Sequence, residues 1–80
     1  MDDDNGVKVI LNGTIVSLPR DIPFEELTKF AFPDAVRSDM IEWEIDYKTA
    51  DNGTPRELHP GKTLEVAREM TINVSYTDKS

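Results

Sequence analysis

Residues 7–18 read VKVILNGTIVSL, which is two apolar runs on either side of Asn12-Gly13. Asn-Gly is the strongest short-range signal for a two-residue β-hairpin, because a type I′ turn needs positive φ at both central positions. Such a turn pairs six residues across one face of the ribbon: Val7 with Leu18, Val9 with Val16, and Leu11 with Thr14. Five of the six are apolar, so we expect this face to contact the core. The opposite face carries Lys8, Ile10, Ile15 and Ser17.

The next segment, IPFEELTKFAF at residues 22–32, predicts one short amphipathic helix. Pro23 suits the first helical turn, where its missing N–H would have no partner, and Glu25 and Glu26 complement the positive end of the helix. Pro33 ends the helix at about Phe32, and a helix this short needs a sheet beneath it to be stable. Four apolar residues recur at the spacing of one helix face: Phe24, Leu27, Phe30 and Ala31.

Alternating apolar and polar residues predict three further strands, at residues 41–48, 63–66 and 70–77. In each strand we expect the apolar residues to face the core and the polar residues to face water. Residues 49–62 contain two glycines and two prolines, so we expect a long loop with a type II turn at Pro60-Gly61. The residues expected to face inward are Ile41, Trp43, Ile45, Tyr47, Leu64, Val66, Met70, Ile72, Val74 and Tyr76.

The predicted order is therefore strand, strand, helix, strand, strand, strand. One helix lying across a four- or five-stranded mixed sheet covers one apolar sheet face, so we expect an α+β protein with a β-grasp fold. In this fold the first and last strands lie side by side as a parallel central pair. A small antiparallel barrel is the alternative, which leaves the helix without a clear role. We expect the domain at 7–77, between a disordered acidic tail at 1–6 and a C-terminal tail at 78–80.

The composition limits the function. The chain has 16 acidic and 9 basic residues and a formal charge of −7, which argues against binding to nucleic acid or membrane surfaces. It has no cysteine and one histidine, His59, so we expect no cofactor, no metal site and no enzyme activity. No apolar run approaches the ~20 residues of a membrane span, and the start MDDDNG is unlike a secretory signal, so we expect a cytoplasmic protein.

The predicted strand at 41–48 has an acidic outer face of Glu42, Glu44 and Asp46. A flat, solvated strand offers no pocket, so these carboxylates are unsuited to catalysis. We interpret them as a solvated face, and docking onto a basic partner surface is the alternative.

Five segments together resemble the bacterial multiubiquitin-type ubiquitin-like domain, over about residues 7–80: VILNGTIVSL, FEELTKFAFPD, IEWEIDYK, HPGKTLEV and MTINVSYTDKS. The last two are the most specific. One departure is Glu69, since we would expect a glycine in the turn before Met70. The resemblance implies a β-grasp fold and a protein modifier, whose C-terminal carboxylate is adenylated, handed between enzymes and attached to a target. The implied partners are activating and conjugating enzymes, a deubiquitinase-like protease and target proteins, encoded in one operon.

By this resemblance the conjugated segment is Thr77, Asp78, Lys79 and Ser80. Ubiquitin-like modifiers usually end in Gly-Gly, which lets a narrow enzyme channel accept the tail, whereas this chain reads Asp-Lys-Ser. Three alternatives stay open: Ser80 itself is joined to the target, a protease first trims the tail, or Ser80 continues into a following domain.

Ubiquitin-like domains are usually bound through an apolar patch on the outer sheet face, so we expect partners to contact Lys8, Ile10 and Ile15. The alternative is that the two isoleucines are exposed incidentally or are covered by a loop. The alternative function is a noncovalent protein-interaction module, or one unit of a tandem structural protein.

Overall fold

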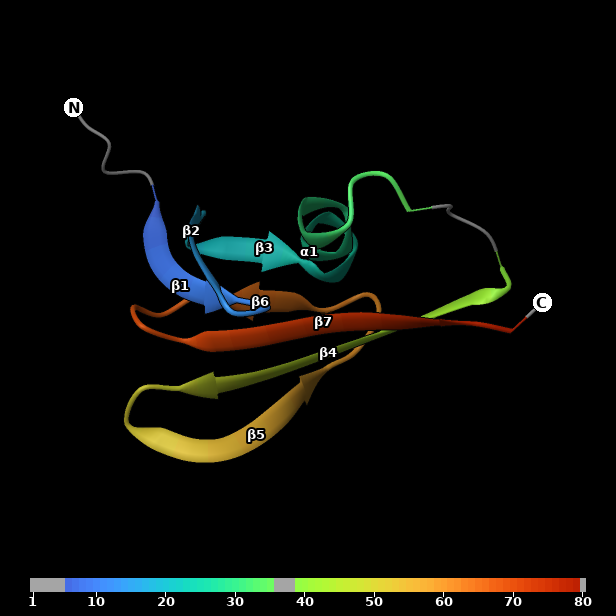
Figure 1. The fold of residues 1–80 in the computed structure, drawn as a ribbon. Coiled ribbons are helices and arrows are strands. Elements are labelled where there is room, and N and C mark those ends of the chain that lie inside the picture. Colours follow the sequence, from blue (N-terminus) through green and yellow to red (C-terminus); the bar gives the residue numbers. More distant parts are fainter. Residues whose placement is uncertain (1–5, 36–38, 80) are drawn as a thin grey trace.

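The computed structural model describes residues 6–35 and 39–79, with Asn52 described by its backbone alone. Five strands form a mixed sheet in the order β2-β1-β7-β4-β5, and β3 pairs with β6 in a separate ribbon. The helix packs across one face of the sheet (Figure 1). The elements of the described chain are β1 (Val7–Leu11), β2 (Thr14–Leu18), β3 (Asp21–Pro23), α1 (Phe24–Ala31), β4 (Ile41–Thr49), β5 (Asn52–Leu58), β6 (Thr63–Glu65) and β7 (Thr71–Asp78).

This architecture is the predicted α+β, β-grasp-like arrangement. The sheet is open and contains a parallel central pair, β1 and β7, so the alternative of a small antiparallel barrel is wrong. The predicted acidic tail at 1–6 lies outside the described residues except for Gly6, as does Ser80 at the other end.

The β1–β2 hairpin has the predicted register, with Val7–Leu11 paired residue by residue with Thr14–Leu18. Asn12 and Gly13 have φ angles of 50° and 84°. These positive angles are those that a type I′ turn requires. The inward face of the hairpin is buried, as at Val9, so the hairpin supplies one side of the core.

β1 and β7 are joined by backbone hydrogen bonds and by one side chain. The Ile10 amide donates to the Met70 carbonyl and the Asn12 amide donates to the Ile72 carbonyl, both at 2.9 Å. Asn12 then extends this ladder with its carboxamide: Oδ1 accepts from the Val74 amide at 2.8 Å, and Nδ2 donates to the Val74 carbonyl at 3.1 Å. Asn12 therefore has two roles. Its backbone forms the hairpin turn, and its side chain bonds to Val74 of β7 as the backbone of one more β1 residue would.

α1 has Pro23 at its N-cap and ends at Ala31, close to the predicted bounds. Phe24 and Leu27 are buried as predicted, but the inward prediction for Phe30 is wrong, since 47% of it is exposed. Thr28 is buried instead, and its hydroxyl donates to the Glu25 carbonyl at 2.7 Å. At 3.6 residues per turn, Phe30 lies about 110° round the helix from the centre of the buried face.

No helix in the described ranges is long and apolar enough to cross a membrane.

β4 follows the predicted alternation, but the loop predicted at 49–62 is wrong because it contains β5. β5 pairs antiparallel with β4, from Leu58 opposite Ile45 to Asn52 opposite Thr49. Its sequence NGTPREL includes a proline, which an edge strand tolerates since one side of its backbone faces away from the sheet.

The turn predicted at Pro60-Gly61 is confirmed. Gly61 has a φ of 84°, and the Lys62 amide donates to the His59 carbonyl at 3.1 Å. The turn leads into β6, which pairs with β3 and brings the buried side chains of Ile22 and Leu64 opposite each other. β3 was not predicted, because its three residues, the last of which is Pro23, are too few to show a periodic pattern.

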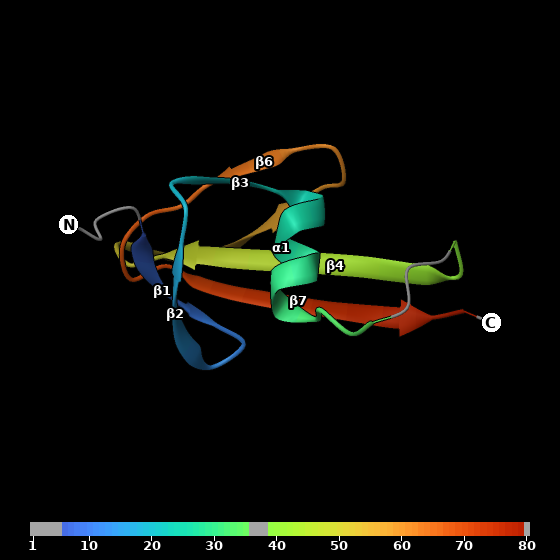
Figure 2. The same cartoon turned by 90° about the horizontal axis from the view of Figure 1, so that it is seen from above.

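β7 lies at the centre of the sheet, between β1 and β4. Met70, Ile72 and Val74 are buried as predicted, whereas Tyr76 lies on the same side but is only partly covered: it packs against Phe32 and Trp43, and 44% of it is exposed. Figure 2 shows the reason: α1 crosses β4 and β7, and both strands run on past one side of the helix, so the helix does not cover their outer part.

A glycine substitution tests the second role of Asn12. Asn12→Gly keeps the positive φ but removes both side-chain hydrogen bonds to Val74, so we expect the free energy of unfolding to fall by about 1–2 kcal/mol. The measurement is urea unfolding followed by circular dichroism.

Glu69→Gly is the matched control, because Glu69 also has a positive φ, of 62°. Both substitutions place a glycine at a positive φ, so the control shows the effect of a more flexible backbone without the loss of the hydrogen bonds to Val74. Equal stability of the two variants would contradict the bridging role of Asn12.

Candidate functional site

The predicted conjugation segment begins inside β7. Thr77 and Asp78 belong to this strand and lie opposite the first two residues of β4. The strand therefore runs one residue past the expected domain boundary at Thr77. β7 lies between β1 and β4, so it delivers the C-terminal segment to one end of the sheet (Figure 1).

Lys79 continues the contact between β7 and β4. Its amide donates to the Met40 carbonyl at 2.7 Å, and its Nζ lies 3.3 Å from Oε1 of Glu42. Both charged side chains are more than half exposed, so solvent screens this ion pair and it contributes little to stability. Lys79 is therefore held by one backbone hydrogen bond and an exposed ion pair, whereas Thr77 and Asp78 are held by strand pairing with β4.

Three aromatic rings pack together where β4 and β7 emerge from beneath α1. Trp43 and Tyr76 have ring centroids 4.9 Å apart, and Phe32 lies 5.3 Å from Tyr76 and 5.9 Å from Trp43. Trp43 and Tyr47 were interpreted as core residues, and both are half-buried. The aromatic cluster covers the part of the sheet that the helix leaves open.

The predicted partner-binding residues do lie together on the face away from α1. Ile10 and Ile15 are directly opposite each other in the hairpin, with 37% and 70% of their surface exposed. Lys8 is exposed and lies on the same face, opposite Ser17. We call Lys8, Ile10 and Ile15 the outer patch. The outward residues of β7 and β4 are mostly polar, so the patch is a local apolar spot.

The remaining chemistry-bearing residues are on the surface. Glu42, Glu44 and Asp46 are exposed along β4, and His59 is exposed in the turn before β6. Among residues 6–35 and 39–79, no group of three or more histidine, aspartate or glutamate side chains is placed to hold a metal ion.

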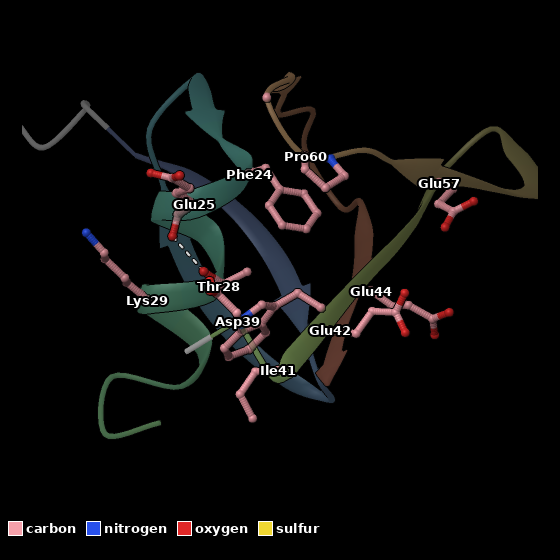
Figure 3. A pocket seen from close by; sticks show the side chains of 12 residues that line it. Phe24, Glu25, Thr28, Lys29, Asp39, Ile41, Glu42, Glu44, Glu57 and Pro60 are labelled. Carbon is pink, nitrogen blue, oxygen red and sulfur yellow. Dashed lines mark hydrogen bonds between the residues drawn. The ribbon is translucent and has the colours of Figure 1, made fainter. Parts of the chain in front are cut away.

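Sequence reasoning missed a groove between α1 and β4, shown in Figure 3. It has a volume of roughly 930 Å³, and its lining comes from α1, from the chain around the start of β4, and from the end of β5 and the turn that follows. Because these segments lie far apart in the chain, no local sequence pattern predicts that they line one groove.

The topology defines a β-grasp-like domain with a solvent-facing outer patch and a strand-bound C-terminal segment. No family model matches this chain, and neither a curated protein nor a solved structure matches it. The fold assignment therefore rests on strand order and pairing. The resemblance to multiubiquitin-type domains rests on the sequence segments alone.

The exposure of the outer patch is tested with one substitution at two positions. Ile15→Thr changes a side chain that contacts mostly water, so we expect the free energy of unfolding to change by less than about 0.5 kcal/mol. Ile45→Thr makes the same change at a side chain with 0% exposure, and should cost about 2 kcal/mol or more because it buries a hydroxyl and leaves a cavity. Urea unfolding gives both values. A cost above about 1 kcal/mol for Ile15→Thr would mean that the patch is already covered.

Proposed function

We propose that this chain is a bacterial ubiquitin-like protein modifier, acting in the cytoplasm as a substrate of conjugating enzymes and not as an enzyme itself. The observation that carries the proposal is the β-grasp-like topology, in which the central strand β7 leads directly into the C-terminal segment. The segments HPGKTLEV and MTINVSYTDKS add the resemblance to multiubiquitin-type domains. The partners would be activating and conjugating enzymes, a deubiquitinase-like protease and target proteins.

In this proposal the C-terminal carboxylate is the acyl donor. A carboxylate oxygen attacks the α-phosphorus of ATP, and pyrophosphate leaves, so an acyl adenylate forms. A nucleophile of the next enzyme then attacks the acyl carbon and AMP leaves. A nucleophile on the target finally takes the acyl group from that enzyme. The domain supplies the carboxylate, and its partners supply the catalytic groups.

The contacts of Lys79 determine how the segment reaches an enzyme. A narrow channel needs an extended chain free of its neighbours, so Lys79 must leave the Met40 carbonyl and the Glu42 carboxylate. Both contacts lie at the exposed end of the sheet, where water replaces them. Detachment of Lys79 leaves the buried pairing of β7 with β1 intact.

The second candidate function is a noncovalent interaction module. Two observations favour it: the strand-bound position of Lys79, and the outer patch with its directly opposed isoleucines. In that case partners bind the outer patch and no acyl bond forms at the C-terminus.

Co-expression with the neighbouring genes, followed by intact mass spectrometry, separates the two functions. The modifier proposal predicts an adduct whose mass exceeds that of the domain and which maps to a terminal carboxylate. Deleting Asp78–Ser80 should abolish the adduct. Exchange of Glu26→Gln, on the exposed side of α1, should leave it unchanged. A free, untrimmed chain in the presence of a demonstrably active enzyme set would contradict the proposal.

A further inference from the structure

The groove between α1 and β4 has an apolar floor. Phe24 of α1, Ile41 and Trp43 of β4, and Pro60 of the turn before β6 all line it. In Figure 3, Phe24 and Pro60 lie together at one end, and Ile41 lies toward the other. These residues give the groove a surface on which hydrocarbon chains can pack.

Strand pairing explains why the groove is open. β5 pairs with β4 only from Ile45 onward, and after Leu58 the chain turns away toward β6. The first part of β4 therefore has α1 on one side and the departing turn on the other, and the groove lies between them. Trp43 and Ile41 face α1, whereas Glu42 and Glu44 alternate with them and point to the opposite side of the strand, away from α1 (Figure 3).

The charged residues at the rim of the groove are mostly acidic. Among the described lining residues five are acidic and one, Lys29, is basic, and Glu42 is also paired with Lys79 at 3.3 Å. A cleft in which one sign of charge predominates attracts ligands of the opposite sign. Glu25 and Asp39 lie on the α1 side of β4, and Glu42, Glu44 and Glu57 lie on the opposite side of the strand (Figure 3).

We infer that this groove binds a basic segment of a partner protein. In an extended segment alternate side chains point to opposite sides, so apolar side chains can pack on the α1 side of the groove while arginine or lysine side chains reach the carboxylates on the other side of β4. The same carboxylates repel phosphate, which argues against a nucleic acid or a lipid headgroup as the ligand. The groove is separate from the outer patch, and its binding requires no acyl bond at the C-terminus.

The test uses the full chain and a defined probe. The probe is the heptapeptide Ala-Arg-Leu-Arg-Leu-Arg-Ala, acetylated and amidated at its ends. The control peptide has citrulline in place of each arginine, which keeps the shape and removes the charge. Binding is followed by ¹⁵N–¹H NMR shifts and by the fluorescence of Trp43, the one tryptophan of the chain.

We expect the arginine peptide to shift the amides around the groove and to bind at least about tenfold more tightly than the citrulline peptide. Higher salt should weaken this binding, because the rim carboxylates are exposed and therefore screened. Equal binding of the two peptides, shifts centred on the outer patch, or no shift up to about 2 mM peptide would each overturn the inference.

Two double variants remove the same charge from different places. Glu44→Gln with Glu57→Gln neutralises the rim, and should weaken the arginine peptide by about threefold to tenfold. Glu26→Gln with Glu65→Gln neutralises two exposed carboxylates outside the groove, and should change the affinity by less than about twofold. Equal weakening by both would mean that the net charge, and not the groove, attracts the peptide. This result is independent of conjugation, so the inference and the modifier proposal can fail separately.

Discussion

The parallel pairing of β1 with β7 is the interaction on which the rest of the structure depends. It joins two strands from opposite ends of the chain, with the hairpin at one side and β4 at the other. The backbone bonds of Ile10 and Asn12 begin the ladder, and the Asn12 carboxamide extends it to Val74. Because loop closure over so long a segment costs entropy, the buried contacts of β7 have to offset that cost. Ile72 and Val74 supply them at the centre of the core.

The way in which the helix crosses the two long strands accounts for the functional surfaces. α1 lies across β4 and β7 (Figure 2), so along the strands it covers about its own diameter of 10–12 Å, whereas β4 and β7 have 9 and 8 residues at about 3.3 Å each. The sheet therefore extends past its helix. The aromatic cluster of Phe32, Trp43 and Tyr76 covers part of this extension, and the acidic groove lies beside it. The C-terminal segment leaves from the same end of the sheet (Figure 2).

Much of this fold is predictable from residues that lie close together in the sequence. The Asn12-Gly13 turn fixes the hairpin register, and strict alternation fixes β4, because in both cases neighbouring residues determine the result. Features that depend on tertiary contacts were missed. β5 has no alternating pattern and forms because it pairs with β4. Phe30 is exposed because α1 turns a different face to the sheet, and Tyr76 is exposed because the sheet extends past the helix. The outer patch was predictable from hairpin register alone, whereas the groove needs three distant segments to come together.

The most direct test is an NMR measurement of scalar couplings across hydrogen bonds in the ¹⁵N,¹³C-labelled chain. The parallel pair predicts couplings from the Ile10 amide nitrogen to the Met70 carbonyl carbon and from the Asn12 amide nitrogen to the Ile72 carbonyl carbon. Couplings that instead join β1 and β7 in an antiparallel pattern, or that join β1 to a strand other than β2 and β7, would contradict the β-grasp-like arrangement. The positions assigned to the C-terminal segment and the groove would then be wrong as well.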